Sequence, residues 1–96
     1  MNSESKILEV IYKTIDDINS ELKISMNKSH DSAIIGQDSE LDSLGVFSFV
    51  TCLENHIETQ FNTTISLIND DFLNGNTEHL QNVNQLQEYL THILEK

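Results

Sequence analysis

The 96-residue chain has no proline, arginine or tryptophan, and it contains only three glycines and one cysteine. The absence of proline and the scarcity of glycine favour helices joined by few sharp turns. Without arginine, the chain lacks the side chain that most often binds phosphate or carboxylate groups through paired hydrogen bonds. The single cysteine, Cys52, excludes an internal disulfide and a zinc site of the C-x-x-C type.

Basic charge and long apolar runs are also scarce. Sixteen acidic residues against five basic ones give a formal net charge of −11, which argues against binding to nucleic acid or to anionic membranes. No apolar run approaches the roughly 20 residues of a membrane-spanning helix, so no membrane insertion is expected. The first residues lack the basic and apolar regions of a secretory signal. We therefore expect a cytoplasmic monomer whose protein partners carry basic surfaces.

The apolar residues that are present recur at three- and four-residue steps, which is the pattern of amphipathic helices. This pattern predicts three longer helices, at about residues 4–21, from Ser43 onward and at about 82–94. A short helix is predicted near residues 69–73. The fold class expected for residues 1–96 is therefore one all-α domain, a small antiparallel four-helix bundle of three longer helices and one short helix.

The helical period is lost between residues 25 and 41, where Ser, Asn, Asp and Gly are frequent. This composition predicts a long loop between helices 1 and 2. Long loops in compact domains are usually either functional or disordered. Three apolar residues are expected to anchor this loop to the core, which favours order: Ile34, Ile35 and Leu41.

The second predicted helix carries apolar residues at helical spacing on one face, namely Val46, Phe47, Val50, Leu53, Ile57 and Phe61. Phe47 and Phe49 are two residues apart, about 200° around a helix, so they cannot both face the same way. Cys52 lies among these apolar residues and is interpreted as a small core residue.

Ser43 stands where the polar loop meets the second helix. A serine or aspartate at this position bonds free amides of the first helical turn, so an N-cap is the simplest interpretation, and Ser39-Glu40-Leu41-Asp42 loosely fits a capping box. The same free amides and the positive end of the helix dipole would favour a phosphodiester attached to Ser43. A serine hydrolase is a weak alternative, because Ser43 is not in a G-x-S-x-G elbow.

The residue pattern predicts no metal site and no catalytic residue. His30-Asp31 and Glu54-Asn55-His56 lack the spacing of the H-E-x-x-H helix motif. We interpret these histidines and carboxylates as solvated polar residues. The sequence therefore does not predict an enzyme.

Several stretches together resemble the acyl carrier protein family. An acidic chain of bundle size opens with an amphipathic helix and a long loop, and the loop ends in the D-S-L triplet Asp42-Ser43-Leu44. The following "SLGVFSFVTCLENHIETQFNTTI" is similar to the second helix of that family and the segment after it. The later "NVNQLQEYL" is similar to its last helix. The resemblance covers nearly the whole chain.

The resemblance implies that Ser43 carries a covalent 4'-phosphopantetheine cofactor, moved from coenzyme A by a phosphopantetheinyl transferase. The thiol of the arm would hold acyl intermediates as thioesters and present them to acyl-loading and acyl-transfer or condensing enzymes with basic docking surfaces. Asp42 and Leu44 match the motif beside the attachment serine. The residues expected to border the acyl groove are Phe47, Val50, Ile65, Ile68 and Phe72.

The second helix departs from the fatty-acid carriers of this family, which usually show several acidic residues there. Gly45 and Ser48 stand two and five residues after the serine. This departure favours a specialised standalone carrier over a housekeeping fatty-acid carrier. The residues expected to contact partners are Gly45, Val46, Ser48, Glu54 and Glu58. The alternatives are an aminoacyl or D-alanyl carrier and an unmodified acidic helical module that binds a basic partner.

Overall fold

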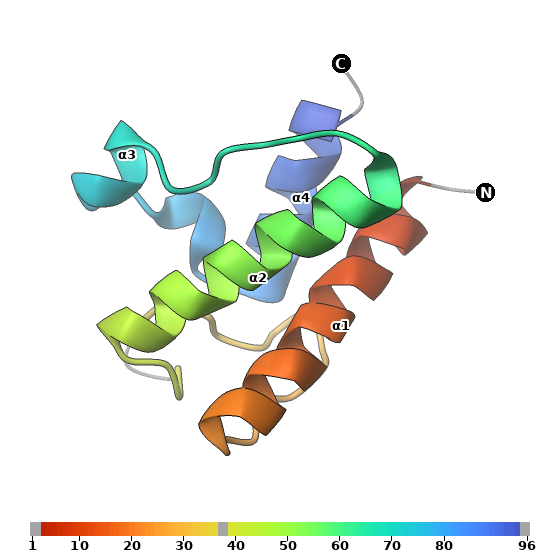
Figure 1. Cartoon of the computed structure of the whole chain (residues 1–96). Helices are drawn as coiled ribbons and strands as arrows, with labels where there is room; N and C mark the ends of the chain where they lie inside the picture. The colour runs from red at the N-terminus through yellow and green to blue at the C-terminus, as the bar shows by residue number, and fades with distance from the viewer. Residues whose placement is uncertain (1–2, 37–38, 95–96) are drawn as a thin grey trace.

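Helices make up the regular structure of this computed structural model, which describes residues 3–36 and 39–94 (Figure 1). The long helices are α1 (Ser3–Leu22), α2 (Ser43–Phe61) and α4 (Val83–Leu94). A single α-helical turn, α3 (Asp70–Leu73), and a 3₁₀ turn, η1 (Glu78–Leu80), lie between α2 and α4. These described residues form no strand, and no helix among them is long and apolar enough to cross a bilayer.

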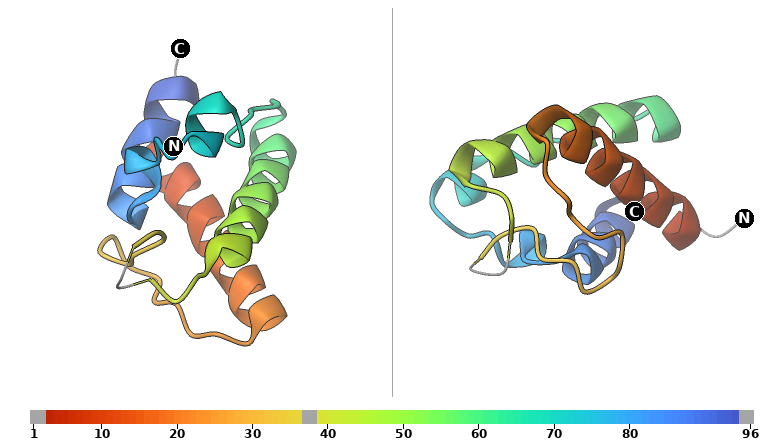
Figure 2. Two further views of the ribbon diagram at one scale, coloured as in Figure 1. Left: turned by 90° about the vertical axis from the view of Figure 1, so that its left-hand side faces the viewer. Right: turned by 90° about the horizontal axis from the view of Figure 1, so that it is seen from below.

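One apolar cluster joins the three long helices into a compact body with a Cα radius of gyration of 12.3 Å. Helix α1 packs against both α2 and α4, as the views in Figures 1 and 2 agree. The fully buried centre combines isoleucines of α1 with apolar residues of α2 and α4 at helical spacing. Its largest members include Ile7, Ile11, Ile15, Ile18, Phe49, Leu53, Ile57, Leu86 and Leu90.

The apolar face of α2 differs from the predicted face at one aromatic residue. Phe49 is fully buried, whereas Phe47 leaves 48% of its surface exposed. Phe49 follows Val46 by three residues and precedes Leu53 by four, and both neighbours are buried, so Phe49 continues their stripe. The expectation that Phe47 belongs to this face was therefore wrong, and Phe49 is the core aromatic residue of α2.

The long loop between α1 and α2 is packed along the body of the molecule. Ile34 is fully buried, Leu41 is 8% exposed and the half-buried Ile35 packs against the core, so all three residues anchor the loop as predicted. Figure 2 shows the loop passing beside the start of α4 before it returns to α2. There the Ile34 amide donates to the Gln81 carbonyl at 2.9 Å, and an isolated antiparallel bridge joins Ala33 to Asn82.

Asparagine stands at the end of one helix and at the start of two others in this proline-free, glycine-poor chain. Asn62 ends α2 in the left-handed region (φ 52°), a conformation that asparagine tolerates better than most residues. The Asn69 side chain accepts from the Phe72 amide at the start of α3. The Asn82 side chain accepts from the Gln85 amide at 2.8 Å and caps α4.

Candidate functional site

The first turn of α2 is capped by Asp42. Its backbone is extended (φ −83°, ψ −174°), and its Oδ1 accepts a hydrogen bond from the Gly45 amide at 2.7 Å. The Asp42 carbonyl accepts from the Val46 amide at 2.9 Å, which is the first bond of the helical ladder. These two bonds are the standard N-cap arrangement, so the helix begins at Ser43.

Ser43 is exposed and is the first helical residue after this cap. No hydrogen bond joins its hydroxyl to another residue in the described parts of the chain. The simplest interpretation of Ser43, as the N-cap, was therefore wrong, because Asp42 performs that function. The loose capping box at Ser39 was wrong too. The Ser39 hydroxyl donates to the Ile34 carbonyl and accepts from the Leu41 amide, and it stabilises the loop instead.

Gly45 holds the start of α2 close to the preceding loop. A Cβ atom at this position would lie 3.1 Å from Leu41 Cδ2 and 3.2 Å from Asp42 Oδ1. These distances are tighter than ordinary van der Waals contacts. The missing side chain thus lets Leu41 fold under the helix start while Asp42 reaches the Gly45 amide.

Two large apolar side chains lie exposed near Ser43. Leu44 leaves 79% of its surface exposed and Phe47 leaves 48%. Most large apolar residues of the chain are buried, so this pair stands out on the surface of α2.

The five predicted groove residues lie in three settings. Val50 is fully buried in the core. Ile65, Ile68 and Phe72 are half-buried and pack against that core from the segment after α2 and from α3. Phe47 instead borders an open hollow beside α1, lined also by Glu21 and Cys52.

The five predicted partner contacts also differ in exposure. Gly45 and Val46 are buried, so their side-chain positions are not available to a partner in this structure. Ser48 is half-buried and Glu58 is exposed. The Glu54 carboxylate is turned to its own chain, where Oε2 accepts from the Leu67 amide at 2.5 Å and from the Ile68 amide at 3.4 Å. Glu54 therefore fixes the segment after α2, and the interpretation as a simply solvated residue was wrong.

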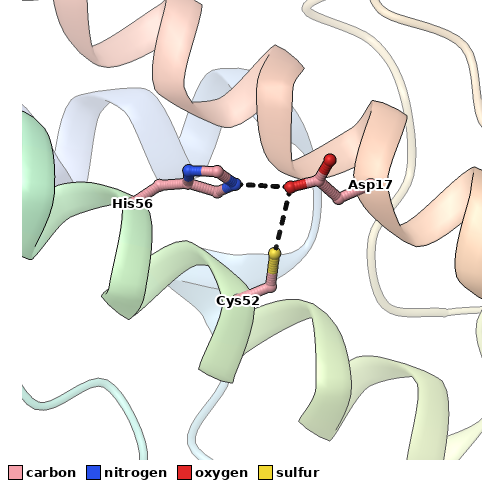
Figure 3. A group of neighbouring side chains, drawn as sticks. All are labelled: Asp17, Cys52 and His56. Atoms are coloured by element: carbon pink, nitrogen blue, oxygen red, sulfur yellow. Dashed lines mark hydrogen bonds and ion pairs between the residues drawn. The ribbon is translucent and has the colours of Figure 1, made fainter.

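A second group of polar side chains, Asp17, Cys52 and His56, lies between α1 and α2 (Figure 3). Asp17 Oδ2 is 2.6 Å from His56 Nε2 and 3.7 Å from Cys52 Sγ. One candidate ligand atom from each residue lies within 4.8 Å of the others. His56 was expected to be solvated, but it is half-buried and contacts the Asp17 carboxylate. Cys52 packs against the edge of the core as a half-buried residue, and its thiol also contacts Asp17.

The sequence held a partial signal for this group. Cys52 and His56 are four residues apart, which places them on one side of α2. Asp17 lies between the buried residues Ile15 and Ile18 of α1, on the edge of the apolar stripe. The register between the two helices, which brings Asp17 opposite the pair, was not readable from either helix alone.

The environment of Cys52 opposes ionisation of its thiol. Partial burial and then the nearby Asp17 carboxylate raise the pKa of Cys52 to about 11. The bonding order also differs from that of a cysteine protease, because the carboxylate lies between the thiol and the imidazole. His56 is thirteen residues from Ser43 along α2, about 20 Å, so it cannot activate that serine as a base.

Comparisons with protein-family models, with curated proteins and with solved structures found no match to this chain.

Proposed function

We propose that the chain is an acyl carrier protein with 4'-phosphopantetheine attached to the hydroxyl of Ser43. The observation that carries this proposal is the division of tasks at the start of α2. Asp42 caps the helix. The exposed hydroxyl of Ser43 lies beside this cap and makes no hydrogen bond with another of the described residues. A transferase can approach such a hydroxyl, and its substitution leaves the cap in place.

The helix end favours the group that would be attached there. The amides of the first helical turn have no partner within the helix, and the dipole places partial positive charge at this end. The Gly45 amide is bonded to the Asp42 side chain, and the first turn of α2 itself contains no acidic residue. A phosphodiester on Ser43 would therefore meet positive helix-end potential in a chain with few basic side chains.

The proposed architecture is an antiparallel four-helix bundle in which α3 is the short helix. In such a fold the acyl chain would enter between α2 and the segment leading to α3. Ile65, Ile68 and Phe72 are suited to this role because they are apolar and only half-buried. Val50 would form the inner wall of the slot. Phe47 lies outside it, and we assign Phe47 to the surface instead.

The proposed partner surface extends along α2 from the Ser43 end and consists of Leu44, Phe47, Ser48 and Glu58. The exposed apolar residues Leu44 and Phe47 would supply contact area near Ser43, and the net charge of −11 would draw basic partners toward the surface. Gly45 and Val46 shape this surface from beneath. The small, weakly charged first turn suits a specialised carrier, with an acyl or an aminoacyl cargo, better than a housekeeping one.

The direct test is modification in vitro. Incubation with coenzyme A and a promiscuous phosphopantetheinyl transferase should raise the intact mass by one phosphopantetheinyl group. Ser43→Ala should show no gain, whereas Ser20→Ala, a matched change at an exposed serine of α1 outside the proposed partner surface, should still be modified. Absence of any gain in the wild type, or an equal gain in Ser43→Ala, would refute the assignment.

An unmodified interaction module is a second candidate, favoured by the exposed pair Leu44 and Phe47. It predicts that Ser43→Ala preserves binding to the physiological partner and that Phe47→Ala weakens it. A carrier predicts that Ser43→Ala abolishes activity in the pathway while leaving the fold intact. The Ser43→Ala variant therefore separates the candidates.

A further inference from the structure

We propose that Asp17, Cys52 and His56 form a binding site for a divalent zinc ion that joins α1 to α2. The site lies on the side of α2 that faces α1, apart from the serine discussed above, and it does not depend on the proposed carrier function. It extends the role of the α1–α2 contact from packing to ligand binding.

The backbone arrangement brings the three ligands together without a loop. Cys52 and His56 are separated by one helical turn on α2, so their side chains project side by side. Asp17 projects from α1 against both of them (Figure 3). The carboxylate oxygen is 3.7 Å from the Cys52 sulfur, close to the separation of two ligands bound to one zinc ion, roughly 3.2–3.8 Å from the usual bond lengths.

The donor atoms select the class of ion. One thiolate, one imidazole and one carboxylate are all common zinc ligands. Mg²⁺ and Ca²⁺ prefer sites made of oxygen atoms, so the sulfur and nitrogen donors disfavour them. Three protein ligands leave one tetrahedral position for water or for an external group.

An open hollow reaches the site on its Cys52 side. The lining of this hollow also includes Glu21, Ser48 and Asn55, so an ion entering there would meet polar groups before the sulfur. The carboxylate of Asp17 is more than half exposed. The strongly negative chain would raise the local concentration of cations around this opening.

Binding requires only a local exchange of bonds. The Cys52 thiol would lose its proton to solvent as the metal–sulfur bond forms. The hydrogen bond between Asp17 and His56 would be replaced by one metal bond from each residue, with the imidazole proton on Nδ1. The 2.6 Å separation of Oδ2 and Nε2 would grow by roughly 0.7 Å to reach a typical ligand–ligand distance, which partly exposed side chains can accommodate by rotation.

The test uses Co²⁺ as a spectroscopic substitute for Zn²⁺ on the full chain with Ser43→Ala. This change removes any thiol that an attached arm would add. Cys52 is then the single thiol, so a near-ultraviolet thiolate-to-cobalt band must come from it. We expect this band, with intense visible bands of tetrahedral cobalt, to saturate at one ion per chain and to disappear when Zn²⁺ is added.

Three ligand variants and two matched controls assign the site. Asp17→Asn and His56→Gln should each weaken Zn²⁺ binding at least about 10–100-fold, and Cys52→Ser should also remove the charge-transfer band. His30→Gln and His92→Gln change exposed histidines elsewhere and should leave affinity unchanged. Circular dichroism checks that each variant is folded.

Thermal unfolding of the chain with all three ligand residues intact complements the variants. Zn²⁺ should raise the melting temperature of the Ser43→Ala chain, and Mg²⁺ at the same concentration should not. The proposal is overturned if no thiolate band forms or if the three ligand variants bind zinc as well as the Ser43→Ala chain in which they are made. It is also overturned if binding requires His30 or His92, or if two chains share one ion. Each result stands whether or not Ser43 is ever modified.

Discussion

Removing the Asp42 side chain should destabilise the protein through one defined hydrogen bond. In Asp42→Ala, the Gly45 amide loses its 2.7 Å partner, while the backbone bond from the Val46 amide to residue 42 remains. Loss of an N-cap side chain typically costs ~1 kcal/mol, within a range of about 0.5–2. Gly45 is buried, so its amide is poorly rehydrated, and we expect a loss of about 1–2 kcal/mol.

Urea denaturation followed by circular dichroism measures this change in the free energy of unfolding. Asp42→Asn is the matched control, because asparagine also caps helices well and removes only the charge. We expect it to stay within about 0.5 kcal/mol of the wild type. An Asp42→Ala variant as stable as the wild type would refute the assigned cap, and equal losses in both variants would show that charge matters more than the hydrogen bond.

Three further predictions concern the core, the segment after α2 and the half-buried thiol of Cys52. Phe49→Ala should lower the free energy of unfolding by about 3–5 kcal/mol, and Phe47→Ala should lower it by less than about 0.5 kcal/mol. The reverse order would mean that the buried face of α2 is misassigned. Glu54→Ala should lower the free energy of unfolding by about 1–3 kcal/mol, because the buried Leu67 amide loses its acceptor. Glu58→Ala should change it by almost nothing in the same denaturation assay, and equal effects of the two changes would contradict the role of Glu54. The raised pKa of Cys52 means that the folded state favours the neutral thiol more than the unfolded state does. The stability that Cys52 contributes for this reason should be complete below about pH 9 and should fall as the pH rises toward 11. Alkylation with iodoacetamide should accelerate about tenfold per pH unit over this range in the metal-free protein, and a plateau near pH 9 would contradict the shift.

The sequence predicted the positions of the long helices because their apolar residues repeat with the helical period. It also predicted the loop anchors Ile34 and Leu41, since isolated apolar residues in a polar loop have few other places to go. The orientation of Phe47 was mispredicted because a six-residue apolar list was read as one stripe. Of the two phenylalanines, Phe49 is the one at helical spacing from both Val46 and Leu53 on the buried side.

The candidate sites were predictable to different degrees. The D-S-L triplet at a loop–helix junction drew attention to Ser43, but local sequence did not separate the serine from the aspartate as the cap. That separation depends on the backbone angles of Asp42 and on which side chain reaches the Gly45 amide. The contact of Asp17 with Cys52 and His56 joins residues 35 or more apart in sequence, so it depends on the relative register of α1 and α2. Such a register is set by the packing of the whole core.

The independence of Ser43 from the cap has a consequence for repeated use. A group placed on its hydroxyl would break no hydrogen bond among the described residues, and a group removed from it would leave none unmade. The free energy of unfolding should therefore change little between the bare and the loaded chain. Repeated attachment and release of such a group would leave the Asp42 cap at the start of α2, and the protein fold, unchanged.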